Sequence, residues 1–292
     1  MKYEGTTYRP PVEADTPLLQ VTVGCAHNSC RFCKMYRDVK FRMCKLEEIE
    51  EDLQEARQIY RHAPRIFLVN GDAFVLSKNR LKPILKLIHQ YFPECETVTM
   101  YASIQNIAAK SDDDLAELKE LGVNDLYVGV ESGYEKAVSF INKGYTIDEA
   151  RKQLKRLNKA GIRHAELLML GVAGKGEGII NAQETVKLLN ETMPFLVWIG
   201  TLAVFEGTEM HADVLNGEFS IATEREILVE EKELINNLEL DGIALYGVHP
   251  TNIAKVSGLL PRDRNRMIAT IDQALEETAP AFLDSQAERK GL

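Results

Sequence analysis

Short apolar runs alternate with amphipathic stretches along most of this chain. The apolar runs are rich in Val, Ile, Leu, Phe and Tyr, and they have the length of strands that are buried on both faces. We therefore predict six strands, at residues 18–24, 65–71, 96–103, 125–132, 165–171 and 195–201.

Helical patterns fill the intervals between these runs. Residues 45–63 place apolar side chains at helical spacing, with charged residues on the opposite face. A later helix is expected to end at Gly122, and another to begin at Thr146, where Glu149 completes a capping box. Strands that alternate with helices in this way predict a parallel sheet with crossover helices.

Six such β/α units extend from about residue 18 to residue 205. Right-handed crossovers would roll them into an α/β fold, a partial (βα)6 TIM-like barrel whose site lies at the carboxyl ends of the strands. Residues 206–292 leave the alternation and are predicted to form a mostly helical extension. We expect one domain, 1–292, because the extension alone would form only a marginal core.

Composition restricts the function classes. The 292 residues are 45% hydrophobic and 27% charged, which is ordinary for a globular protein. The net charge of −9 gives no overall attraction to nucleic acid, so a nucleic-acid partner is not expected. No apolar run approaches the ~18 residues of a membrane span, and the N-terminal residues have no signal-peptide pattern. We therefore expect a cytoplasmic protein without a membrane partner.

Three cysteines follow the first predicted strand. Cys25, Cys30 and Cys33 form a C-x4-C-x2-C run in "VTVGCAHNSCRFCKMY", and such tight runs are typical of iron–sulfur clusters. A [4Fe–4S] cluster with three thiolate ligands has one iron open to a small molecule. Structural zinc is the alternative, although it takes four ligands. Five cysteines in all argue against a disulfide framework.

This loop, with Phe32 before the third cysteine, resembles that of the radical S-adenosylmethionine (radical SAM) enzymes. Most members have C-x3-C, and the wider spacing here is similar to a subgroup with "GCxHNxCxFCxMY". The resemblance implies a [4Fe–4S] cluster whose open iron binds S-adenosylmethionine. It also implies reductive cleavage to a 5′-deoxyadenosyl radical that removes hydrogen from a substrate. The resemblance further implies a reductant such as flavodoxin or ferredoxin, and an anaerobic setting.

The resemblance also implies which strand ends bind S-adenosylmethionine. Gly71 and Asp72, in "VNGDAFVL", would contact the methionine amino group, although Asn70 and Asp72 replace the usual glycine and glutamate. Glu131, in "YVGVESG", would bind the ribose hydroxyls. The stretch after it, "ESGYEKAVSFINKGYT", is similar to relatives of oxygen-independent coproporphyrinogen oxidase. An ordinary turn or a helix cap is the alternative for each segment.

Four further residues have two interpretations each. Ser103 would contact the methionine carboxylate or would be a helix N-cap. Gly171 begins a glycine-rich loop that the family places near adenine, although a surface loop has the same composition. Val204 and Phe205 would pack on adenine or belong to the core.

Substrate contacts are predicted in "YGVHPTN". Tyr246, His249 and Asn252 form a polar group there, and a histidine suits proton donation or a substrate hydrogen bond. Local hydrogen bonds that stabilise the loop are the alternative. Cys44 and Cys95 are isolated in the sequence, so no second cluster is expected.

The predicted function is therefore that of a radical SAM enzyme acting on a small molecule or another substrate that no motif identifies. A non-catalytic metal-binding protein, either a zinc-stabilised barrel or an iron–sulfur electron carrier, is the first alternative. The second is an accessory member of the family that lacks robust catalysis.

Overall fold

The computed structural model describes residues 3–289, which divide into two compact units. The first unit takes residues up to Asn28, with Met35–Gly129 and Gln153–His164. The second takes Ser29–Lys34, Val130–Lys152 and the residues from Ala165 onward. Each unit is described by itself.

The first unit is built on parallel strands. They are β1 (Leu18–Gln20), β4 (Arg65–Val69), β5 (Thr97–Ala102) and β6 (Val123–Glu131), in that spatial order. Pairing is parallel throughout, with Leu18 opposite Phe67 and Tyr101 opposite Tyr127. Phe67 is fully buried, as expected for a strand covered on both faces.

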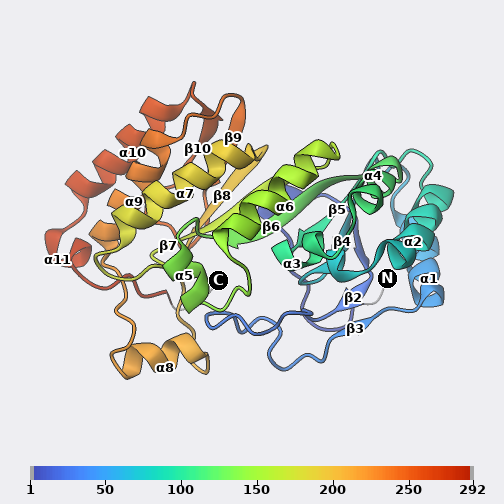
Figure 1. Ribbon diagram of the computed structural model, residues 1–292, viewed down its shortest axis with the longest axis horizontal. Helices are drawn as coiled ribbons and strands as arrows, with labels where there is room; N and C mark the ends of the chain where they lie inside the picture. Colours follow the sequence, from blue (N-terminus) through green and yellow to red (C-terminus); the bar gives the residue numbers. More distant parts are fainter. Residues whose placement is uncertain (1–2, 290–292) are drawn as a thin grey trace. The chain divides into compact units, whose positions relative to one another are not determined.

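Helices and short elements complete the first unit. The helices are α1 (Leu46–Ile59), α2 (Lys78–Tyr91), α3 (Ile104–Ala108), α4 (Asp112–Glu120) and the end of α6 (Ile147–Lys159). The short elements are β2 (Thr22–Val23), paired with β3 (Arg42–Met43), and the 3-10 turns η1 (Pro11–Glu13) and η2 (Ala73–Val75). Figure 1 shows α1, α2 and α4 close together, and α2 packs on both of the others.

Buried charges join the amino-terminal ends of these strands. Arg65 binds Glu13 and Asp125 at 2.5 Å each, and the Tyr127 hydroxyl donates to Glu13 at 2.6 Å. Glu13 and Asp125 are 2% and 1% exposed, so each carboxylate is compensated where it is buried. The network connects the N-terminal segment to the sheet, at the strand ends opposite the predicted site.

The second unit continues the α/β pattern. Its strands are β7 (Arg163–Leu170), β8 (Leu196–Thr201) and β9 (Ile243–Gly247), which are parallel, and β10 (Val256–Leu260), antiparallel to β9. Its helices are α5 (Glu135–Phe140), α7 (Gly178–Thr192), α8 (Glu209–Leu215), α9 (Glu224–Asn237), α10 (Arg264–Glu277) and α11 (Pro280–Leu283). The α9 helix packs on both α7 and α10 (Figure 1).

The predicted fold class is confirmed: an α/β fold with eight mostly parallel strands, consistent with a partial (βα)6 barrel and a mostly helical C-terminal part. The predicted caps are confirmed too, since Gly122 has φ +92° and Thr146 and Glu149 exchange hydrogen bonds. The antiparallel β10 was not predicted. Between residues 3 and 289, no helix is both long and apolar enough to cross a membrane. The single-domain organisation stays a prediction.

Candidate functional site

The cysteine loop begins directly after β2. In the first unit, Asn28 adopts φ +40° and its side-chain amide donates to the Tyr36 carbonyl at 2.8 Å. Tyr36 is 5% exposed, so its ring is part of the core beneath the loop. Asn28 and Tyr36 therefore fix the loop around Cys25, a role that sequence reasoning did not assign to them.

The turn after β4 packs against this loop. The Gly71 N–H donates to the Tyr36 hydroxyl at 3.1 Å. A Cβ placed on Gly71 would lie 2.8 Å from the Cys25 Cβ and 2.9 Å from the Tyr36 ring. Only glycine leaves room for this approach. The structure thus places predicted residue Gly71 against predicted cluster ligand Cys25.

Polar side chains on either side of Gly71 are buried. Asn70 is 1% exposed, and its Oδ1 has no hydrogen-bond partner within residues 3–289. Asp72 is 4% exposed and accepts a hydrogen bond from the Asn106 side-chain amide. A buried amide oxygen and a carboxylate beside the cysteine loop suit a ligand with an amino group, because both accept hydrogen bonds.

Asn106 and Lys110 support Asp72 from α3 and the turn after it. Lys110 is 4% exposed, and its ammonium donates to the carbonyls of Phe74 at 2.6 Å and Asn106 at 3.2 Å. Burial lowers the pKa of Lys110 to about 8, although attraction to Asp72 opposes this. Neither Asn106 nor Lys110 was predicted, because their contacts with residues 72–74 span more than thirty positions of sequence.

Ser103 directly follows β5 and is the N-cap of α3. Its hydroxyl accepts the Asn106 N–H at 3.3 Å. The N-cap interpretation is therefore confirmed, and contact with the methionine carboxylate stays a prediction.

The rest of the cysteine loop lies in the second unit. The Cys33 N–H donates to the Cys30 carbonyl at 3.2 Å, so a single turn carries both thiols and the half-buried Phe32. Arg31, in the same turn, donates its N–H to Ile141 and accepts from Met210 through its carbonyl, both at 3.1 Å.

The Arg31 side chain adds a second anchor. Its guanidinium binds the Asp213 carboxylate at 2.5 Å and lies 4.9 Å from the centre of the Phe140 ring. Asp213 is buried, whereas the Arg31 side chain is 30% exposed, so only the carboxylate side of this pair is desolvated. The turn is therefore fixed to α5 and α8 before any metal binds.

Glu131 ends β6 with φ +65°, a conformation that directs its side chain away from the strand pattern. Its carboxylate lies 3.1 Å from the Lys143 ammonium, and the two side chains are 14% and 12% exposed. Burial lowers the pKa of Lys143, but attraction to Glu131, Cys30 and Tyr145 outweighs this and raises it. Lys143 is thus attracted electrostatically to both Glu131, the predicted ribose ligand, and Cys30, a predicted cluster ligand.

The adenine-side residues follow β7 and β8 along the chain. Gly171 comes directly after β7 with φ +75°, and a Cβ there would lie 2.5 Å from Ile227 Cδ1. Val204 and Phe205 are half-buried, and the Lys34 ammonium lies 4.6 Å from the centre of the Phe205 ring. Phe205 therefore contacts the cysteine loop, which the sequence did not indicate.

The predicted substrate residues separate into two kinds. Asn252 is 4% exposed and its side chain bonds Thr201 and the carbonyls of Ile199 and Gly247, so it stabilises the loop. This is the structural alternative stated for the segment, and a catalytic role for Asn252 stays a prediction.

His249 and Tyr246 instead gather around Trp198. The His249 and Trp198 rings meet edge-on at 4.9 Å, and Tyr246 is opposite Trp198 in the β8–β9 register. His249 Nδ1 lies 2.6 Å from the Thr251 hydroxyl, and burial lowers the pKa of His249. The ring is therefore neutral at physiological pH and can donate or accept a hydrogen bond.

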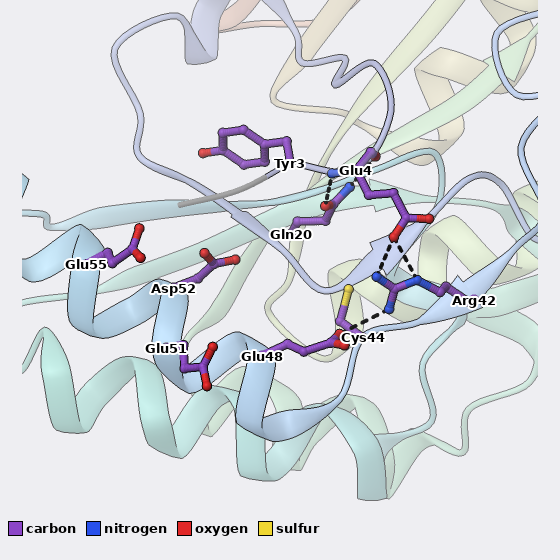
Figure 2. A pocket seen from close by; sticks show the side chains of 9 residues that line it. All are labelled: Tyr3, Glu4, Gln20, Arg42, Cys44, Glu48, Glu51, Asp52 and Glu55. Carbon is purple, nitrogen blue, oxygen red and sulfur yellow. Dashed lines mark hydrogen bonds and ion pairs between the residues drawn. The ribbon is translucent and has the colours of Figure 1, made fainter.

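A separate cavity of about 310 Å³ lies in the first unit (Figure 2). Its walls carry mostly acidic side chains, and none of its residues belongs to the predicted cofactor site: Tyr3, Glu4, Gln20, Arg42, Cys44, Glu48, Glu51, Asp52 and Glu55. Burial raises the pKa of Cys44 to about 11, so this thiol stays protonated at neutral pH. Cys95 is 3% exposed and burial raises its pKa to about 11 as well.

These residues fit the cofactors that the sequence suggested. Gly71 lies against Cys25, Asn70 has an unsatisfied buried oxygen, and Cys30 and Cys33 share a braced turn. Cys25 belongs to the first unit and the other two cysteines to the second, so joint ligation by all three stays a prediction.

Cysteines and polar groups placed at the carboxyl ends of parallel strands define a cofactor-dependent α/β enzyme. The model of the radical SAM superfamily matches residues 19–189, more than half of the chain. The chain belongs to this superfamily and is a radical SAM enzyme, a class that uses a [4Fe–4S] cluster and S-adenosylmethionine.

Several proteins are similar to the chain. Uncharacterized protein MJ0486 of Methanocaldococcus jannaschii is 24% identical over 238 residues, which cover 78% of this chain and 70% of that protein. The methyltransferase TsrM of Kitasatospora setae has a TM-score of 0.56 and 16% identity, covering 69% of this chain and 39% of that one. Coproporphyrinogen III oxidase (HemN) of Escherichia coli has a TM-score of 0.52 and 13% identity, covering 84% and 64%.

These likenesses show a shared fold. The chain spans less than two thirds of either solved structure.

Proposed function

We propose that Cys25, Cys30 and Cys33 ligate one [4Fe–4S] cluster and that S-adenosylmethionine binds its open iron. The observation that carries this is the packing of Gly71 on Cys25, with a 2.8 Å approach that excludes any side chain. A glycine packed this closely on a cluster ligand supports the proposal, because glycine lets a bound ligand approach the backbone closely. When bound, the cluster and S-adenosylmethionine supply a 5′-deoxyadenosyl radical that removes hydrogen from a substrate.

The chain's own residues bind and orient the cofactor. In the first unit, Asn70 and Asp72 offer oxygen acceptors to the methionine amino group, and Asn106 holds Asp72 in place. In the second unit, Glu131 binds the ribose hydroxyls, and the Lys143 ammonium lies 3.1 Å from its carboxylate. Phe32, Ser103, Gly171 and Val204 complete the cofactor contacts.

The substrate is a small molecule that contacts the aromatic side chains of Trp198, Tyr246 and His249. Trp198, Tyr246 and His249 offer flat apolar surface and a neutral imidazole, which together suit a substrate with both an apolar part and a polar one. Asn252 acts indirectly, since its hydrogen bonds hold the loop that carries His249.

A one-electron carrier such as flavodoxin or ferredoxin supplies the reductant. Residues 31–42 contain five basic residues against one acid, in a chain whose net charge is −9, and two of them, Arg31 and Arg42, are paired with Asp213 and Glu4. A basic segment at the cluster suits an acidic carrier protein, because opposite charges steer the encounter. We further propose that the protein is cytoplasmic and works under anaerobic conditions. It would belong to the C-x4-C-x2-C subgroup of the superfamily and form a single domain.

The test is product formation under anaerobic conditions. Reconstituted protein given dithionite and S-adenosylmethionine should turn brown and release 5′-deoxyadenosine and methionine in equal amounts. The matched control is Cys25→Ala, which removes one ligand and should release neither product. A colourless zinc protein, or a brown protein that releases no 5′-deoxyadenosine, would leave the zinc-stabilised barrel or the electron carrier in its place.

A further inference from the structure

A buried carboxylate on α9 connects to the Gly171 turn. Glu230 is 2% exposed, and its Oε2 accepts the Gly171 N–H at 2.9 Å. Its other oxygen, Oε1, accepts from the side-chain amide of Asn181 on α7 at 2.6 Å. A Cβ on Gly178 would lie 3.2 Å from Oε2, so the start of α7 also surrounds this carboxylate closely.

Asn181 extends these contacts to the end of β6. It is 4% exposed, and its Oδ1 accepts from the Ser132 hydroxyl at 2.5 Å. Ser132 is fully buried, directly follows Glu131, and its Oγ accepts the Tyr134 N–H at 2.8 Å. One continuous set of hydrogen bonds therefore runs from the residue beside Glu131 to the Gly171 turn.

The same helix holds the backbone after Ser132. The Gly133 N–H donates to the Thr185 hydroxyl at 2.8 Å, and a Cβ on Gly133 would lie 2.5 Å from the Thr185 Cα. A small cavity of about 10 Å³ has Glu131, Asn181, Thr185 and Glu230 among its lining residues. The end of β6 is thus packed on α7 with little free space.

The donors and acceptors form one ordered series, in which Ser132 donates to Asn181 and Asn181 donates to Glu230. The Gly171 N–H and the Asn181 amide both donate, so position 230 must accept at both of its oxygens. The Oδ1 of Asn181 then remains as its acceptor, and the Ser132 hydroxyl donates to it. A carboxylate meets both demands at position 230, whereas an amide of the same shape meets one.

We propose that Glu230 and Asn181 are positioning residues that hold the Glu131 and Gly171 strand ends together as one binding surface for the nucleoside of S-adenosylmethionine. This inference rests on the proposed function. Glu230 belongs to the C-terminal part of the chain, beyond residues 19–189, which carry the match to the superfamily. The C-terminal part is thereby assigned a role in cofactor affinity as well as in covering the strands.

The test compares cofactor binding in Glu230→Gln and in the matched control Glu233→Gln. Glu233 lies three residues further along α9, is half-buried, and accepts a hydrogen bond from the Gln183 side chain of α7 at 3.0 Å. Equilibrium dialysis should give a dissociation constant for S-adenosylmethionine about tenfold higher in Glu230→Gln, and unchanged in the control. Iron content should stay at the wild-type value in both, and 5′-deoxyadenosine release at saturating cofactor should fall less than the affinity.

A reciprocal substitution separates positioning from general damage. Asn181→Asp places a second acceptor against Glu230 and should weaken binding, whereas Asn181→Asp combined with Glu230→Gln restores one donor and one acceptor. The double variant should bind more tightly than either single variant. Ser132→Ala, which breaks the same set of bonds elsewhere, should raise the dissociation constant and decides the question if Glu230→Gln does not fold.

The outcomes distinguish this inference from the proposed function. Wild-type protein that binds no S-adenosylmethionine contradicts the proposed function itself. Wild-type binding with an unchanged constant in folded Glu230→Gln, or in Ser132→Ala, overturns the positioning role alone. A double variant no better than the single ones overturns it too.

Discussion

Gly71 leaves the room that the cysteine loop needs, because any side chain there would contact Cys25 and Tyr36 too closely. We expect Gly71→Ala to lose most of its iron, because the added Cβ must displace either Cys25 or the Tyr36 ring. Gly200→Ala is the matched control, since its nearest neighbours would lie 3.6 Å away, an ordinary contact distance. Iron and sulfide per chain after anaerobic reconstitution give the comparison, with circular dichroism to confirm folding. Equal loading in both variants would show that Gly71 does not limit the cysteine loop.

Asn106 provides a second prediction for a single side chain. Asn106→Ala leaves the buried Asp72 carboxylate without the amide that donates to it, so we expect S-adenosylmethionine to bind about tenfold more weakly. Asn216 is exposed and its side chain makes no hydrogen bond within residues 3–289, so Asn216→Ala should bind as wild type does. The measurement is a dissociation constant by equilibrium dialysis. An unchanged constant for folded Asn106→Ala would remove Asp72 from the proposed cofactor contacts.

The structural role of a single residue could be predicted where it depends only on its neighbours in the sequence. The Thr146–Glu149 capping box and the Gly122 cap follow from neighbouring residue types, and both are confirmed. Lys143 and Asn106 were missed, because their roles depend on where a distant strand end lies. Ser103 shows the opposite case, since the ordinary local role, an N-cap, is the one observed.

At the level of elements, α9 shows what hydrophobic periodicity conveys and what it omits. The pattern predicts the helix, but neighbouring acids such as Glu230 and Glu231 have the composition of a solvated face. They are 2% and 1% exposed, because α9 packs on α7 and on α10. Sequence periodicity reports one buried face, so a helix covered on several sides is described incompletely. The antiparallel β10 was missed for a similar reason, since its apolar run is short and interrupted by Gly258.

Glu231 gives this element a pH-dependent prediction. Burial, with repulsion from Glu230 and against attraction to Lys255, raises the pKa of Glu231 to about 8. The folded state therefore favours the protonated acid, and this stabilisation is lost as the pH rises from the unfolded pKa through about 8. Glu231→Gln removes the titration, so relative to wild type it should gain on the order of 3 kcal/mol in unfolding free energy between about pH 5 and about pH 9.

Urea unfolding at the two pH values measures this difference. Glu233→Gln, which changes a half-buried acid on the same helix, should show no such trend. A stability difference between Glu231→Gln and wild type that is the same at both pH values would contradict the burial account.

On the scale of the whole molecule, strand–helix alternation predicted the α/β class and all six of the expected strands. It could not predict that the cysteine loop contributes to two compact units, with Cys25 in one and Cys30 and Cys33 in the other. Contacts such as Arg31 with Asp213, which brace the loop, join residues about 180 positions apart and leave no local pattern. The cysteine spacing predicted an iron–sulfur cluster. The structure added the residues that pack around Gly71 and Lys143, which the spacing could not indicate.

A cysteine series tests the ligand set across the whole chain. Replacement of Cys25, Cys30 or Cys33 by Ala should each abolish the cluster, since a three-ligand site has no spare thiolate. Cys44→Ala and Cys95→Ala should retain it, because burial raises the pKa of both thiols and keeps them protonated. Visible absorbance and iron content distinguish the two groups. Loss of iron in Cys44→Ala, with the fold intact, would require a different ligand set.

Mössbauer spectroscopy of the iron-57-enriched protein, reconstituted anaerobically, shows whether one iron of the cluster is open to S-adenosylmethionine. We expect a [4Fe–4S] cluster in which S-adenosylmethionine changes the spectrum of one iron and leaves the other three as they were. A cluster in which no iron responds to S-adenosylmethionine, or a protein that binds no cluster at these cysteines, would contradict this expectation.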